Sequence, residues 1–91
     1  MTNWTTLPYE GLRAYQAARQ LLLLVHEAKI ADTRLRDQAL RAAKSVCLNI
    51  AEAVGRYSAA DQKRVFAIAR GEVCEVNAAL DIAAFVGRHS Y

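Results

Sequence analysis

The chain has 91 residues, of which 54% are hydrophobic and 23% are charged. This composition is typical of a globular domain and argues against disorder. The net charge of +3 permits an acidic partner but does not require one. One proline and four glycines are few, which favours long helices joined by short turns. We therefore predict one all-α domain over residues 1–91.

Two features bear on the compartment in which the protein acts. Cys47 and Cys74 each lie in a helical pattern, so we expect small buried apolar residues in a reducing compartment rather than a disulfide or a metal pair. No basic segment precedes an apolar run at the N-terminus, and the longest apolar run, residues 21–25, is too short to cross a bilayer. These features predict a cytoplasmic protein that makes no membrane contact.

The first helix is predicted over residues 8–29, because Pro8 suits a first helical turn. Apolar residues recur three and four positions apart and form one buried stripe, namely Leu12, Tyr15, Ala18, Leu22 and Val25. Leu24 falls outside this stripe, toward the polar side. An apolar residue outside the main stripe is the first indication of a second buried surface.

The second helix is predicted over residues 34–54, with Asp32 or Thr33 as its N-cap and Gly55 available for a left-handed C-terminal residue. Its apolar residues cover about half of the circumference, which is more than one neighbouring helix needs. They are Leu35, Ala39, Leu40, Ala42, Ala43, Val46, Cys47, Ile50, Ala51, Ala53 and Val54.

A polar row, Ser45, Asn49, Glu52 and Arg56, follows one side of this helix at spacings of +4, +7 and +11. Serine and asparagine are unfavourable in a helix interior, so a tertiary partner is expected to hold them there. A packed hydrogen-bonding row is favoured over a catalytic site, because buried polar groups are paired. We predict that Asn49 and Glu52 join Arg70 or Glu75 in a structural polar cluster, either buried or at an interface.

The third helix is predicted over residues 58–86 and begins at Ser58. A continuous apolar stripe follows Phe66, Ala69, Val73, Val76, Leu80 and Ala83, as in a helix bundle. A second stripe of mostly small residues lies behind it, namely Ala67, Gly71, Cys74, Ala78 and Phe85. Mid-helix Gly71 costs about 1 kcal/mol relative to alanine, which indicates close packing.

Three helices of one small chain cannot bury two apolar faces of the third helix. We therefore predict an antiparallel up-down bundle of three long helices that is completed by oligomerisation. The predicted interface consists of Leu24, Ala67, Gly71, Cys74, Ala78 and Phe85. The alternative is that the small residues are simply exposed residues of good helix propensity.

Four segments in order resemble motifs of one protein family. Residues 45–56, SVCLNIAEAVGR, resemble the signature S-[VI]-x-x-N-I-A-E-G-x-G-R of the bacterial four-helix bundle family, also called the 23S rRNA intervening-sequence proteins. Residues 12–18 (LRAYQAA), 38–43 (QALRAA) and 66–71 (FAIARG) resemble three further family motifs, and Glu75 stands at a recurrent family glutamate. The resemblance extends over about residues 8–87. Ala53 and Glu72 depart from it, where the family usually has glycine and serine.

The resemblance implies an up-down-up-down helical bundle without enzymatic activity that assembles as a ring, commonly a pentamer. It also implies a distant relation to the accessory proteins of diversity-generating retroelements, which bind a reverse transcriptase and nucleic acid. The family's fourth helix would begin where this sequence ends, at Tyr91. A shortened variant and a bundle completed by a neighbouring copy are both consistent with that.

No catalytic, cofactor or metal site is expected, because His26 and His89 lie on different elements without cysteine or carboxylate spacing for a metal. Candidate nucleic-acid contacts are Arg34, Arg41 and Arg56 on the second helix and Lys63 and Arg70 on the third. The alternative is a solvated helix surface. No aromatic platform is expected beside these cations, so base-specific recognition is not predicted.

The sequence therefore predicts a non-enzymatic homo-oligomer that binds RNA or DNA. The alternative function is a protein-interaction scaffold or accessory subunit, for example for a reverse transcriptase.

Overall fold

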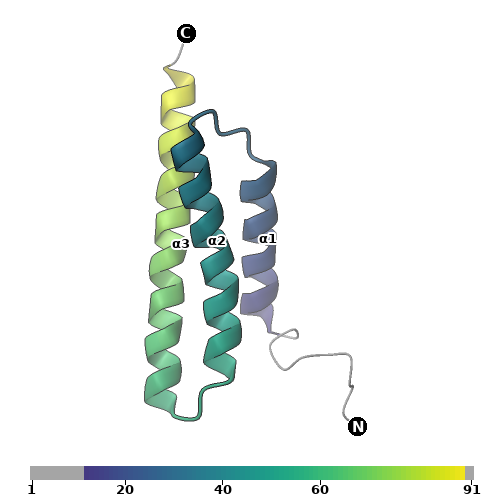
Figure 1. Ribbon diagram of the computed structural model, residues 1–91, viewed down its shortest axis with the longest axis vertical. Coiled ribbons are helices and arrows are strands. Elements are labelled where there is room, and N and C mark those ends of the chain that lie inside the picture. Colours follow the sequence, from purple (N-terminus) through teal and green to yellow (C-terminus); the bar gives the residue numbers. More distant parts are fainter. Residues whose placement is uncertain (1–11, 90–91) are drawn as a thin grey trace.

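The structure, a computed structural model, describes residues 12–89 and contains three α-helices and no strand within that range. They are α1 (Arg13–Glu27), α2 (Thr33–Val54) and α3 (Ala59–Arg88), which run up, down and up along the long axis of the molecule (Figure 1). The all-α prediction is confirmed. Pro8 and the rest of residues 8–11, where the first helix was expected to begin, lie outside the described residues.

Capping side chains set where α2 and α3 begin. Asp32 Oδ1 accepts hydrogen bonds from the backbone N–H groups of Arg34 (3.0 Å) and Leu35 (3.1 Å), so Asp32 rather than Thr33 is the N-cap of α2. Ser58 Oγ accepts from the backbone N–H of Asp61 at 3.0 Å and caps α3 as expected. Each cap satisfies donors that have no partner within the helix.

The prediction of a left-handed conformation at Gly55 is wrong. Gly55 has a φ of −82° and stays in the right-handed region, and no described residue has a positive φ. The backbone N–H groups of Gly55 and Arg56 instead donate to the carbonyl oxygens of Glu52 and Ala53, respectively. This tight last turn satisfies two carbonyls of α2 and leads directly into the cap of α3.

Helix α2 lies in the middle of the chain's packing. α1 and α3 both pack against it, whereas α1 and α3 hardly touch one another (Figure 1). The breadth of the α2 apolar face therefore serves two neighbours within one chain and does not by itself require another copy. Its buried residues are Ala39, Ala42, Ala43, Val46, Cys47, Ile50 and Ala53.

The stripe predicted on the first helix is confirmed, because Ala18 and Val25 are buried and Leu12, Tyr15 and Leu22 are half-buried against the core. On α3 one position differs from the prediction. Val65 is 2% exposed and belongs to the core, whereas Phe66 is 40% exposed. The face of α3 that packs on α2 runs through residues 65, 69, 76 and 79. Phe66, the next residue after Val65, is turned about 100° away from it around the helix.

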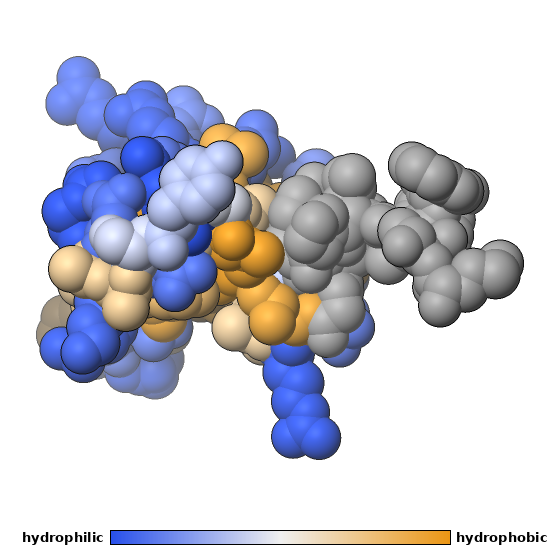
Figure 2. All heavy atoms as spheres, turned by 90° about the horizontal axis from the view of Figure 1, so that it is seen from below, coloured by the Kyte–Doolittle hydropathy of each residue, from blue (hydrophilic) through white to orange (hydrophobic). Residues whose placement is uncertain are grey.

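The end of the bundle that carries the α2–α3 turn is largely hydrophilic, but hydrophobic side chains reach the surface in the middle of this view (Figure 2). None of the described helices combines the length and the apolar character needed to cross a membrane.

Candidate functional site

The polar row of α2 is held together in pairs. Asn49 Nδ2 donates to the backbone oxygen of Ser45 at 3.0 Å, and both residues are half-buried. Arg56 forms an ion pair with Glu52. Both interactions join residues four apart in sequence, so each pair satisfies its own polar groups locally.

The contact between the end of α2 and the start of α3 is made by Arg56, Asp61 and Gln62. Arg56 Nη1 lies 3.4 Å from Asp61 Oδ2, and Gln62 Nε2 donates to the backbone oxygen of Arg56 at 3.3 Å. Asp61 Oδ1 also accepts from Arg64 Nη2 at 3.0 Å. Asp61 was not predicted as a partner of Arg56. The sequence did contain a signal for this contact, namely two opposite charges five residues apart on either side of the helix N-cap.

Arg70 and Glu75 are exposed and make no hydrogen bond or ion pair within residues 12–89. The structure therefore does not bring them to Asn49 and Glu52 inside one chain. A polar cluster of these residues at an interface between chains stays a prediction.

Four of the five candidate nucleic-acid contacts are exposed cations that form no ion pair in the described part of the chain. They are Arg34, Arg41, Lys63 and Arg70. The fifth, Arg56, is engaged by Glu52 and Asp61. Each helix contributes two of the four, seven residues apart. That spacing is about two helical turns, or about 10 Å along the axis, so each pair shares one face.

The expectation that no aromatic residue lies beside these cations is wrong. Lys63, Phe66, Ala67 and Arg70 line a surface hollow of about 320 Å³ on α3. Phe66 was predicted in the buried stripe, but the register of α3 differs by one residue, so that Val65 is buried and Phe66 lies at the surface. A phenyl ring and two cations therefore share one exposed face.

The six residues predicted at an oligomer interface are all exposed in the single chain. Five of them lie on α3, and a Cβ added at Gly71 would meet nothing within 4 Å, so no packing inside the described chain explains this glycine. Leu24, on α1, is not brought to them because α1 hardly touches α3. Larger exposed apolar side chains that the interface prediction did not include, Ile82 and Val86, lie near Phe85 at the C-terminal end of α3.

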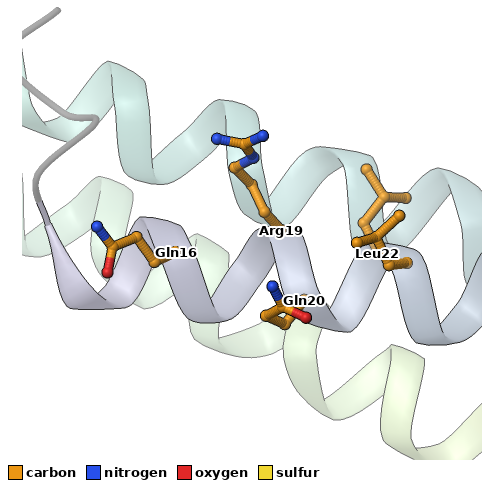
Figure 3. Close-up of a pocket in the computed structure, with 5 residues that line it drawn as sticks. Gln16, Arg19, Gln20 and Leu22 are labelled. Atoms are coloured by element: carbon orange, nitrogen blue, oxygen red, sulfur yellow. The ribbon is translucent and has the colours of Figure 1, made fainter. Parts of the chain in front are cut away.

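A hollow of about 430 Å³ lies on α1 and is lined by Gln16, Arg19, Gln20, Leu22 and Leu23 (Figure 3). All of these described lining residues come from α1, and Gln16, Arg19, Gln20 and Leu22 follow one another along that helix (Figure 3). Arg19 is the one titratable group among them. General acid–base chemistry uses positioned pairs of titratable groups, which this set does not supply.

The two cysteines differ, and the prediction that both are buried is wrong for Cys74. Cys47 is buried and Cys74 is exposed. Burial raises the pKa of the Cys47 thiol, with a backbone hydrogen bond and the nearby Arg19 acting in the opposite direction. This favours the neutral thiol, which is a weak nucleophile. Among the described residues, no three histidine, cysteine or acidic side chains are grouped so that they could hold a metal ion.

The fold and these surfaces define an antiparallel helical bundle protein with basic outer faces. A sequence model of the family described as 23S rRNA-intervening sequence protein matches residues 10–89, which include all three helices. The chain belongs to this family. Comparison with curated proteins gave no match, and comparison with solved structures gave none either.

Proposed function

We propose that this protein is a non-enzymatic homo-oligomer of the cytoplasm that associates with nucleic acid through the outer faces of α2 and α3. The observation that carries the proposal is the set of four exposed cations without ion pairs, Arg34, Arg41, Lys63 and Arg70. A cation with no carboxylate partner is available to neutralise a phosphate and release its counterion. Membership of a family described by rRNA intervening sequences is consistent with an RNA partner.

Self-association is proposed because α3 presents large apolar side chains to solvent near its C-terminal end. Ile82, Phe85 and Val86 are 51%, 56% and 55% exposed. Contact with another copy would remove this area from water, at a gain of roughly 25 cal/mol per Å² of apolar surface. In a closed ring, with a pentamer as the favoured copy number, the basic faces repeat and their phosphate contacts reinforce one another.

The second candidate function is a protein-interaction scaffold or accessory subunit, with a reverse transcriptase as one conceivable partner. The same exposed row of Ile82, Phe85 and Val86 favours it, because apolar residues gathered on one surface often mark protein contacts. The two functions differ in their dependence on salt. Phosphate contacts weaken steeply as salt rises, whereas an apolar protein contact does not.

The test is a binding titration of fluorescently labelled RNA and DNA against the full chain at several salt concentrations. We expect log K to fall linearly with log salt, and Arg41→Gln and Arg34→Gln each to reduce the slope by about 0.7 to 0.9. Asp37→Asn, an uncharged substitution on α2 that removes no cation, is the control and should not reduce the slope. Binding that is absent, or that does not depend on salt, contradicts the nucleic-acid proposal and favours the scaffold.

Size-exclusion chromatography coupled to light scattering tests the oligomer separately. A mass that stays at 10.1 kDa at the highest measurable concentration would exclude self-association.

A further inference from the structure

The hollow on α3 formed by Lys63, Phe66, Ala67 and Arg70 combines two kinds of side chain. Phe66 is 40% exposed at its centre, and Ala67 is too small to cover the ring. Lys63 precedes Phe66 by three residues and Arg70 follows it by four, so the two cations lie one turn below and one turn above the ring on the same helix face.

The charge around this hollow is of one sign. At 100° per residue, Asp61, Glu72 and Glu75 lie roughly on the far side of α3 from the Phe66 face. Neither Lys63 nor Arg70 makes an ion pair within the described residues. The two cations are therefore available to an anionic ligand on either side of the ring.

This combination matches the chemistry of single-stranded nucleic acid. An unpaired base stacks on an aromatic side chain whatever its identity, and flanking cations follow the phosphates. The bases of a duplex are already paired and stacked, so they do not offer a face to Phe66. Contact of the two cations with a duplex backbone would leave the ring unused.

A second copy of the chain is a less suitable occupant of the same face. A two-fold contact centred on it would bring Lys63 and Arg70 against the same two residues of the other copy, and like charges facing each other are unfavourable. The apolar residues Ile82, Phe85 and Val86 lie more than two turns further along α3 and offer self-association a surface with no such repulsion.

We infer that the Phe66 face of α3 binds single-stranded nucleic acid, with one base stacked on the Phe66 ring and phosphates held by Lys63 and Arg70. The inference rests on the proposed nucleic-acid role and specifies the strandedness and the contact residues. It predicts binding that depends on the ring and tolerates changes of base sequence.

The test compares a fluorescently labelled single-stranded 12-nucleotide RNA with a duplex of the same length, using the full chain and fluorescence anisotropy. Phe66→Leu keeps the apolar bulk and removes the ring, and we expect it to weaken single-strand binding about tenfold while duplex binding stays within about twofold. Phe66→Tyr restores a ring and should restore binding. Arg70→Gln should lower the salt slope for the single strand by about 0.7.

Tyr57→Leu is the control, because Tyr57 is a fully exposed aromatic residue in the α2–α3 turn that lies outside the hollow and outside the residues proposed for self-association. It should leave single-strand affinity unchanged. Thermal unfolding and light scattering of every variant show whether fold and assembly are intact.

Each outcome decides between the alternatives. If the wild-type chain binds neither nucleic acid, both the proposed function and this inference fail. If it binds with a steep salt dependence but Phe66→Leu binds as tightly, the nucleic-acid role stands and the stacking site is wrong. If Phe66→Leu changes the oligomeric mass and not the affinity for RNA, the face is an interface between copies and the inference is overturned.

Discussion

Arg56 Nη1 lies 3.4 Å from Asp61 Oδ2, and this ion pair joins the C-terminal end of α2 to the first turn of α3. Both side chains are only about one-third exposed. Asp61 also stands in the acidic first turn of its helix, where a carboxylate interacts favourably with the helix dipole, and it accepts from Arg64 as well. One carboxylate therefore joins the two helices and also stabilises the first turn of α3.

We expect Asp61→Asn to lower the free energy of unfolding by about 1 kcal/mol, as the sum of a partly screened ion pair and the dipole interaction. That corresponds to a melting temperature about 4–8 °C lower for a chain of this size. Urea and thermal unfolding measure it. Asp37→Asn removes an exposed carboxylate that has no ion pair in the described structure, so equal stability of the two variants would contradict this role.

Asn49→Ala separates a local role of the polar row from an interfacial one. Among residues 12–89, the hydrogen bond of the Asn49 side chain goes to the backbone oxygen of Ser45 on its own helix, and alanine has the higher helix propensity. We therefore expect the stability of the dilute chain to change by no more than about 0.5 kcal/mol. If the polar cluster forms between chains, the same variant weakens association.

Stability at low concentration and mass by light scattering at high concentration measure the two effects of Asn49→Ala. An unchanged melting temperature together with unchanged assembly would count against the predicted cluster.

Gly71 gives the sharpest test of close helix packing between copies. Because a Cβ at this position meets nothing within 4 Å, Gly71→Ala should stabilise the single chain by about 1 kcal/mol through helix propensity. Gly71→Met should fit the isolated chain equally well but obstruct another helix that approaches the backbone. We expect normal folding by circular dichroism together with weaker self-association.

Ala14, which is exposed on α1 and lies outside both the predicted interface and the row of Ile82, Phe85 and Val86, provides the Met substitution used as control. If Gly71→Met and Ala14→Met associate equally well, Gly71 does not lie at a close interface.

Burial raises the pKa of the Cys47 thiol above its usual 9.0. The folded chain therefore keeps this proton to a higher pH than the unfolded chain does, and the contribution to stability is complete below pH 9.0. It is lost as the pH rises through the folded pKa. We expect the stability difference between the wild type and Cys47→Ser, which presents no thiol, to shrink above about pH 9 in urea titrations.

The two thiols should also differ in reactivity. At a chain concentration low enough to keep the chain monomeric, a thiol reagent at pH 8 should label exposed Cys74 at least about tenfold faster than Cys47. A constant stability difference across this pH range, or equal labelling rates, would contradict the burial of Cys47.

Much of the fold follows from periodicity and capping residues in the sequence. The starts of α2 and α3 were correctly predicted because Asp32 and Ser58 satisfy backbone donors that any helix leaves open. The α2 core was predictable because its apolar residues recur at helical spacing. Neither property depends on what the rest of the chain does.

The positions of Phe66 and of the α2–α3 contact were not predictable in this way. Phe66 and Val65 are both apolar and adjacent, so hydrophobic spacing does not distinguish which of them faces α2. Arg56 was assigned to its i,i+4 partner Glu52, and its second partner Asp61 depends on the direction in which the turn brings α3 back. Arg70 and Glu75 were predicted to meet Asn49 across the contact of α2 and α3, but both are exposed and make no hydrogen bond or ion pair within the described residues.

The sequence by itself determined three antiparallel helices and the family to which they belong, because helix caps and 3.6-residue periodicity act over a few neighbouring residues. Only the tertiary structure decided that α2 serves both neighbours, that α1 and α3 hardly touch, and that Phe66 faces outward between two cations. The physical reason is that the rotation of a helix about its own axis is set by the side chains of the helix packed against it, which lie far away in the sequence.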